Sequence, residues 1–287
     1  MQNGNARTLE SPQAPLFWRA PLHRSYANYF GRKLFEFLLT VHGVGAFALI
    51  TLGVLLSKLR SSNRVIYPLV LREVSRAGLR LLPMFLFLAA ALGLVVVGQT
   101  LTWLGRIPAV MDYLGTIMVV VVVRELGPLI AALLVLARIG TANVVELGTA
   151  RALGEIDALE ALGIDPIHYL VVPRVIGMAV GILSLTVYLI LGALVTGYLW
   201  IFVQDVPVRP SEYFNQLAGA LSGLDFVLLA LKASLFGYII AIVTCYHGLA
   251  QPLRLEEVSH ATVRAVAQSV IACVLLDALF IVIYLLV

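Results

Sequence analysis

The stretch RELGPLIAALLVLARIGTANVVELGTARALGEIDALEALGIDPIHYLVVPR, residues 124–174, decides how the chain is organised. It opens with two full charges, Arg124 and Glu125, which follow five consecutive valines at 119–123 and precede another strongly apolar segment. Ionised side chains inside an apolar span are costly and usually face a cavity or a partner. The acidic segment after them is too polar to span a membrane. The stretch therefore indicates a transport path joined to a cytoplasmic docking element.

The composition predicts an all-α polytopic membrane protein. The 287 residues are 61% hydrophobic and 13% charged, whereas a soluble domain carries about 25% charged residues. Residues 1–22 are polar and show no secretory signal, so we expect a flexible tail followed by a single domain at 23–287. The two cysteines, Cys245 and Cys273, lie in apolar stretches and are predicted to be small buried hydrophobes rather than a disulfide or metal ligands.

Five segments each contain the roughly 20 mostly apolar residues that a membrane span needs. Lys and Arg beside the spans predict the orientation, because cytoplasmic flanks carry an excess of both. Residues 58–80 form a basic loop and are expected inside, whereas the acidic loop at 204–223 is expected outside. This places the N-terminus in the cytoplasm and the C-terminus in the periplasm. The predicted spans are 81–103, 110–137, 171–203, 224–248 and 264–287.

A sixth apolar segment at 34–57 has two possible placements. Basic residues flank it on both sides, so a true span would carry one basic flank to the outside. An interfacial helix would keep both flanks in the cytoplasm with one face buried among lipid headgroups. We favour the interfacial helix and keep the span as the alternative.

The two charges at 124 and 125 need partners from other spans. They lie roughly 16–20 Å from the outer end of their span, and adjacent helical residues point about 100° apart, so they cannot simply neutralise each other. Pro128 frees a backbone carbonyl four residues earlier and can kink the helix. Lys232 and Asp277 fall at comparable depths in two other spans and are the predicted partners. With Asp277 the four charges balance; without it they would be net positive.

This predicted cluster has two interpretations. It could be an ion network that only holds the bundle together, or it could line a polar substrate cavity. We favour the cavity, because four ionisable groups from three spans would meet at one level. A positive rim would suit a phosphate headgroup, since Arg and Lys are natural phosphate partners. A nearby Glu125 could gate entry or hold the basic groups in place.

The acidic segment at about 150–163 is predicted to be a short helix, which Gly163 and Pro166 end. Three apolar residues recur at helical spacing and form one stripe, while three acidic residues line the other sides. The helix could be a solvated connection, or it could fit a groove on a partner protein. The stripe consists of Ile156, Leu159 and Leu162, and the acidic residues are Glu155, Asp157 and Glu160.

Several motifs are absent from the sequence. It has no G-x-x-x-x-G-K-[ST] and no Gly-Lys pair, so the chain cannot bind ATP through a P-loop of its own. It also has no G-x-S-x-G elbow, H-E-x-x-H or metal-binding cysteine pair. Any energy from ATP must therefore come through another chain.

The elements R-E-L-G-P, A-R-x-G, E-L-G-T and E-I-D-A-L-E-A-L-G-x-D-P occur together in residues 124–174. In this combination the sequence resembles the MlaE family, the permease subunits of ABC-type phospholipid transporters that serve the bacterial outer membrane. The similarity is dense over that stretch and continues more loosely from residue 68 to the end. It is far more specific than any one element alone.

The resemblance implies a homodimer in the bacterial inner membrane, each copy with an interfacial helix and five spans. A separate ATPase, which uses ATP and Mg, would dock on the coupling helices at about 150–163, and a STAS-domain protein would bind the ATPase. A hexameric MCE-domain protein would sit on the outer side. The resemblance implies no cofactor on this chain and no nucleic acid. It also implies a phospholipid cavity at the dimer interface, lined by Arg124, Glu125 and Lys232, with Asp277 and Arg264 at other polar family positions.

The predicted function is therefore a lipid-moving permease subunit without its own ATPase site. An ion- or proton-coupled secondary carrier is the alternative, with the intramembrane Glu125, Asp277 and Lys232 as a relay. Such a carrier would have no use for a coupling helix. An intramembrane lipid enzyme is the third interpretation, but no nucleophile or metal constellation supports it.

Overall fold

The computed structural model describes residues 39–56, 63–104, 113–204, 209–249 and 254–286. The chain divides into two units, Met1–Gly45 and Ala46–Val287. In the first, the described residues 39–45 begin the helix Leu39–Leu56. The second unit contains most of the described residues. Every regular element among the described residues is helical, which confirms the predicted all-α class.

The second unit begins within the helix Leu39–Leu56 and continues as a series of α-helices interrupted by short 3₁₀ and π segments. The 3₁₀ segments are η2 and η6, and the π segments are η3, η4 and η5. In chain order the elements are α2 (Asn63–Ala77), η2 (Leu79–Leu81), α3 (Leu82–Leu104), α5 (Leu114–Met118), η3 (Val119–Leu126), α6 (Gly127–Val135), η4 (Leu136–Gly140), α7 (Thr141–Ala152), α8 (Glu155–Ala161), η5 (Ile167–Val171), α9 (Val172–Val203), α10 (Pro210–Ala220), α11 (Gly223–Leu249), η6 (Leu255–Glu257) and α12 (Val258–Leu286).

The described residues contain six helical stretches long and apolar enough to cross a membrane, so this is a multi-pass membrane protein. The first, Leu39–Leu56, has the length and hydropathy of a span. Its length therefore does not distinguish a span from an interfacial helix, and the interfacial placement stays a prediction. The predicted tail at 1–22 lies outside the described residues. The other five stretches are Tyr67–Thr102, Leu114–Ala152, Ile167–Val203, Gly223–Leu249 and Leu255–Leu286.

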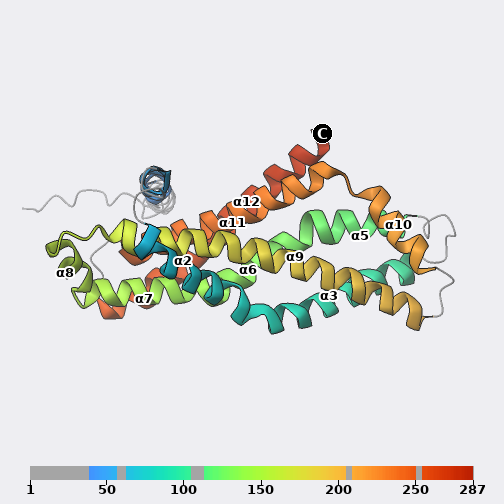
Figure 1. Ribbon diagram of the computed structural model, residues 1–287, viewed down its shortest axis with the longest axis horizontal. Helices are drawn as coiled ribbons and strands as arrows, with labels where there is room; N and C mark the ends of the chain where they lie inside the picture. The colour runs from blue at the N-terminus through green and yellow to red at the C-terminus, as the bar shows by residue number, and fades with distance from the viewer. Residues whose placement is uncertain (1–38, 57–62, 105–112, 205–208, 250–253, 287) are drawn as a thin grey trace, which may run out of the picture. The chain divides into compact units, whose positions relative to one another are not determined.

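Helix α9 is the centre of the bundle and packs against α2, α3, α6 and α11 (Figure 1). Small residues allow these close approaches, as is common between helices in membranes. A Cβ at Gly93 on α3 would lie 2.3 Å from the backbone oxygen of Ala193 on α9. A Cβ at Gly181 on α9 would lie 2.7 Å from the Cβ of Ala77 on α2. The bundle therefore depends on glycine where α2 and α3 cross α9.

Two expected loops are helical. The basic loop expected at 58–80 contains α2, which forms because it packs on the glycine face of α9. The acidic outer loop expected at 204–223 contains α10, which Tyr213 holds to α9 by donating a hydrogen bond to the Leu194 carbonyl at 3.3 Å. Charge patterning alone does not reveal helices whose stability comes from tertiary packing.

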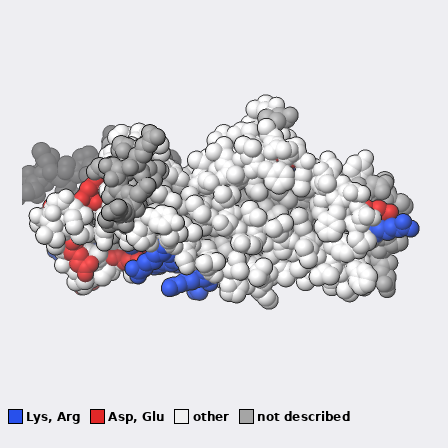
Figure 2. All heavy atoms as spheres, in the orientation of Figure 1, with Lys and Arg blue, Asp and Glu red and all other residues white. Residues whose placement is uncertain are grey.

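The two ends of the bundle differ from its middle. Helix α8 lies at one end and α10 at the other (Figure 1). On the face in Figure 2, Lys, Arg, Asp and Glu gather near these ends, and the wide stretch between them has almost no charged surface. Such an uncharged band is what a bilayer core requires of a lipid-facing surface.

Candidate functional site

The site begins with a π-helical segment, η3, in the middle of its span. The N–H of Gly127 donates to the carbonyl of Val122, five residues back. Pro128 has no N–H, so it leaves the carbonyl of Arg124, four residues earlier, without its usual helical donor. The Lys232 Nζ on α11 donates to that carbonyl at 2.8 Å. Pro128 was predicted to free a backbone carbonyl, and Lys232 was predicted to be a cluster partner. The structure shows that Lys232 donates a hydrogen bond to that freed carbonyl.

Lys232 is completely buried, and its ammonium lies among three oxygen acceptors. Besides the backbone carbonyl, Nζ lies 3.1 Å from Glu125 Oε2 on η3 and 2.7 Å from Asp277 Oδ1 on α12. Nζ donates hydrogen bonds to the Arg124 carbonyl and to Glu125 Oε2, and it forms a close ion pair with Asp277 Oδ1. Lys232 therefore joins three spans and, being inaccessible, is not open to a ligand in this state.

Arg124 points to a different partner, Asp225 in the first turn of α11. Its Nε lies 2.9 Å from Asp225 Oδ1, and its Nη2 donates to Oδ2 at 3.1 Å. The guanidinium also lies over the Tyr284 ring of α12, with Cζ 5.2 Å from the ring centroid. The pair thus consists of one hydrogen bond from Nη2 and a close ion-pair contact at Nε, and a charge-assisted bond of this kind is stronger than a neutral one. Arg124 is thus held in a fixed orientation between α11 and α12.

Asp225 is a cluster member that the sequence did not predict, because it lies just after the acidic loop expected at 204–223 rather than inside an apolar run. The Ser222 N–H donates to Asp225 Oδ2 at 2.9 Å, and the Asp225 N–H donates to Ser222 Oγ at 3.3 Å. This reciprocal pair is a capping box, and S-x-x-D before an apolar run is its sequence signal. That signal places Asp225 in the first helical turn, two turns before Lys232 and on the same face.

The cluster contains three carboxylates and two cations, so it has no permanent positive rim. The predicted residues Arg124, Glu125, Lys232 and Asp277 do meet, but Arg124 is engaged by the fifth member, Asp225. The side chains of Arg124 and Glu125 are 26% and 27% exposed, whereas Lys232 is inaccessible. A ligand could therefore reach only the two η3 side chains without first breaking the buried pairs.

The predicted coupling segment is found in the structure as helix α8. Gly154, with a φ of +78°, separates α8 from α7, so the helix begins at Glu155 rather than at 150. Gly163, with a φ of +74°, follows its end, and the Ile164 N–H returns to the Leu159 carbonyl at 3.0 Å. Glycine at a left-handed position is the usual helix terminator. The short helix is therefore bounded on both sides by backbone that favours glycine.

The apolar stripe of α8 is only partly covered. Ile156 is buried, Leu159 is half-buried, and Leu162 is 75% exposed. These three side chains help to line a groove of about 480 Å³ between α8, α7 and η5. The acidic side chains Glu155, Asp157 and Glu160 are exposed, and Arg151 on α7 pairs with Asp157 at 3.1 Å and with Glu160 at 3.7 Å. The helix thus presents an acidic surface and an apolar groove at one end of the bundle.

Cys245 and Cys273 are free, buried thiols. Within the described ranges, no group of three His, Cys, Asp or Glu residues is placed to hold a metal ion.

The chain is similar to a permease family and to several known proteins. The family described as Permease MlaE matches residues 70–283. A probable ABC transporter permease protein of Rickettsia felis is 30% identical over 246 residues, which cover 85% of this chain and 91% of that protein. A probable ABC transporter permease protein of Synechocystis is 34% identical over 160 residues, 55% of this chain and 60% of its own length. The chloroplastic protein TRIGALACTOSYLDIACYLGLYCEROL 1 of Arabidopsis thaliana is 30% identical over 165 residues, 57% of this chain and 47% of its own length.

Proposed function

Because this chain belongs to the MlaE family of ABC transporter permeases, we propose that it moves phospholipids between the inner and outer membranes. The observation that carries this proposal is the charge cluster joining η3, α11 and α12. Two of its members, Arg124 and Glu125, are accessible, and a guanidinium is a natural partner for a phosphodiester. Ionisable groups at such a depth mark a substrate path by default.

We further infer the assembly in which the chain works. Two copies would form the lipid cavity, and a separate ATPase using ATP and Mg would dock on α8. A STAS-domain protein would bind the ATPase, and an MCE-domain hexamer would receive or deliver lipid on the periplasmic side. The exposed Leu162 and the acidic side chains of α8 support docking at this end, because an amphipathic helix commonly fits a partner's groove. This arrangement places the N-terminus in the cytoplasm and the C-terminus in the periplasm of an inner-membrane protein.

The cluster contains two separate groups of ion pairs: Arg124 with Asp225, and Lys232 with Glu125 and Asp277. Their separation suggests how a lipid headgroup could be held and released. When Arg124 pairs with Asp225, the guanidinium is neutralised and offers little to a phosphate. When that pair opens, Arg124 can bind the headgroup, while Lys232 continues to hold Glu125 and Asp277. ATP hydrolysis in the partner would then move the permease between two states that differ in affinity for the lipid.

A reconstituted transfer assay tests the proposal. The chain, purified from its own host with its co-purifying subunits, is placed in vesicles loaded with a fluorescent phospholipid. We expect movement of the label that depends on ATP hydrolysis and does not respond to ionophores. We also expect Arg124→Gln to reduce transfer by at least tenfold, while Arg254→Gln, at an exposed position, leaves it unchanged.

Transport that is independent of ATP and sensitive to ionophores would instead identify the alternative function, an ion- or proton-coupled secondary carrier. Transport that continues without nucleotide and stops when proton or sodium gradients collapse would establish a secondary carrier. A complex that retains no ATPase would point the same way, because a carrier does not need α8 as a docking helix.

A further inference from the structure

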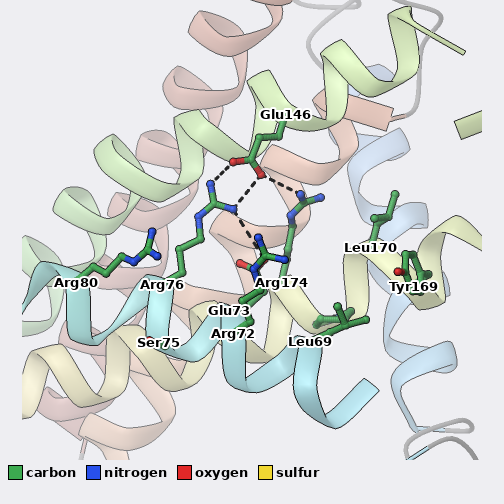
Figure 3. Close-up of a pocket in the computed structure, with 11 residues that line it drawn as sticks. Leu69, Arg72, Glu73, Ser75, Arg76, Arg80, Glu146, Tyr169, Leu170 and Arg174 are labelled. Carbon is green, nitrogen blue, oxygen red and sulfur yellow. Dashed lines mark hydrogen bonds and ion pairs between the residues drawn. The ribbon is translucent and has the colours of Figure 1, made fainter. Parts of the chain in front are cut away.

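A polar cavity lies apart from the charge cluster, between α2, α7 and the junction of η5 with α9 (Figure 3). Its volume is about 570 Å³, which is within the usual range for small-ligand pockets. The charged residues lining it are Arg72, Glu73, Arg76, Arg80, Glu146 and Arg174. Four guanidinium groups thus face two carboxylates, and the pocket has a positive balance.

An ion-pair network forms the back of this pocket. Both terminal nitrogens of Arg76 reach Glu146 on α7, and Arg174 on α9 donates to Glu146 Oε2 at 3.1 Å. Figure 3 shows Arg76 and Arg174 converging on Glu146. The Nε and Nη1 atoms of Arg174 are buried and have no hydrogen-bond partner within the described part of the chain. Buried donors without partners are costly, and a bound anion would satisfy them.

Two further guanidinium groups that line the pocket take no part in this ion-pair network. Arg72 and Arg80 are exposed, and neither makes an ion pair with any residue that the structure describes. They lie four residues to either side of Arg76, so the three form one ridge along α2 and η2. The pocket therefore combines a fixed interior, Arg76 and Arg174, with two free cations at its edge.

The pocket lies where two spans enter the bilayer. Arg80 is the last charged residue before the uncharged run 81–104, and Arg174 is the last before the uncharged run 175–203. Both residues line the same cavity. Exposed apolar side chains of α2 and η2, Leu71 and Leu79, lie on either side of the ridge in sequence. This combination of apolar surface and cations at the bilayer boundary fits a lipid, whose phosphate lies at that level.

We propose that this pocket binds the phosphate headgroup of an anionic phospholipid of the leaflet beside α8. Arg72 and Arg80 contact the phosphate at the pocket edge, while Arg174 turns its free donors toward the headgroup. The lipid is a resident ligand, distinct from any lipid at the charge cluster. This inference does not depend on the transport function proposed above.

Such a lipid would lie directly beside the coupling region. The pocket shares Glu146, Tyr169, Leu170 and Arg174 with the groove under α8. A headgroup that stabilises Arg174 therefore also stabilises the wall on which α8 rests. The bound lipid would connect the composition of the membrane to the helix proposed to receive the ATPase.

Native mass spectrometry of the purified full-length chain tests the proposal. The probes are dioleoyl phosphatidylglycerol, dioleoyl phosphatidylcholine and free glycerol phosphate. The pocket variant combines Arg72→Gln with Arg80→Gln, and the control combines Arg209→Gln with Arg254→Gln. All four residues are exposed, so both variants remove the same charge without disturbing the core.

We expect the wild type and the control to retain phosphatidylglycerol in preference to phosphatidylcholine. The pocket variant should bind one fewer phosphatidylglycerol per chain, with roughly tenfold to thirtyfold weaker affinity at that site, since each arginine near an anionic headgroup contributes a factor of about five. Free glycerol phosphate should not compete at equal concentration.

Three results would overturn the proposal. One is equal retention of phosphatidylglycerol by the wild type and the pocket variant. Another is full competition by free glycerol phosphate, which would make the ligand a soluble anion. The third is loss of a co-purifying protein from the pocket variant with lipid retention unchanged, which would assign the arginines to a protein interface. Each result can be obtained whether or not the chain transports lipid.

Discussion

Replacing Lys232 by methionine should destabilise the protein by about 3 kcal/mol. The substitution keeps the length of the apolar stem but removes the ammonium that lies 3.1 Å from Glu125 and 2.7 Å from Asp277. Removing one partner from a buried ion pair typically costs about 3–5 kcal/mol, because a charge is left without compensation. Glu125 is 27% exposed and can recover some solvation, so we expect the lower end of this range. The Arg124 carbonyl also loses its donor.

The assay is unfolding of the purified chain by SDS in mixed micelles, followed by circular dichroism. The companion variant Lys232→Met with Asp277→Asn removes a cation and a carboxylate together. It should be more stable than Lys232→Met alone by about 1–3 kcal/mol, as expected for directly interacting residues. Strictly additive effects, or a loss below about 1 kcal/mol for Lys232→Met, would show that the cluster does not hold the three spans together.

Three further predictions concern other parts of the chain. Asp225→Asn should reduce lipid transfer at least fivefold, because Arg124 loses its charged partner; an unchanged transfer rate would count against control of Arg124 by this pair. Leu162→Asp on the exposed end of the α8 stripe should abolish co-purification of the ATPase without altering thermal stability, and undiminished recovery of the ATPase would exclude docking at this side chain. Gly93→Ala should lower the free energy of unfolding by about 1–3 kcal/mol, since the new Cβ would lie 2.3 Å from a backbone oxygen of α9, whereas Gly219→Ala meets nothing within 4 Å and should be nearly neutral.

The depth of the charged residues along their spans was enough to predict the part of the cluster around Lys232. Counting residues from the outer ends of the spans predicted that Lys232 and Asp277 lie near Glu125, and the structure places all three within ion-pair distance. Pro128 was also a sufficient guide to a freed carbonyl, because its missing N–H is a covalent property of the residue. The π-helical geometry of η3 was not predicted, since it depends on how the surrounding helices accept the extra residue.

The Arg124–Asp225 pair could not be predicted from the net charge of the loops and spans. Asp225 follows the acidic loop expected at 204–223 and was not predicted to belong to the cluster, although Ser222 and Asp225 form a capping box that starts α11. The basic residues of α2 predicted a side of the membrane but not a helix, because α2 depends on contact with glycines of α9 that lie about a hundred residues away. Helix α8 begins at Glu155 and not at the predicted residue 150, because Gly154 adopts a left-handed backbone conformation. This difference could have been predicted from the sequence, since glycine favours that conformation.

Photo-cross-linking at Tyr284 tests the central claim that a phospholipid passes the charge cluster. The Tyr284 ring lies 5.2 Å from the guanidinium carbon of Arg124, so a benzoylphenylalanine at this position samples the space beside the proposed headgroup ligand. With the complex in vesicles of ³²P-labelled phospholipid, we predict a labelled adduct whose yield changes on addition of ATP. The same probe at Phe87, which is 78% exposed on α3, should give an adduct that ATP does not change. No lipid adduct at position 284, or one as insensitive to ATP as that at position 87, would contradict the account.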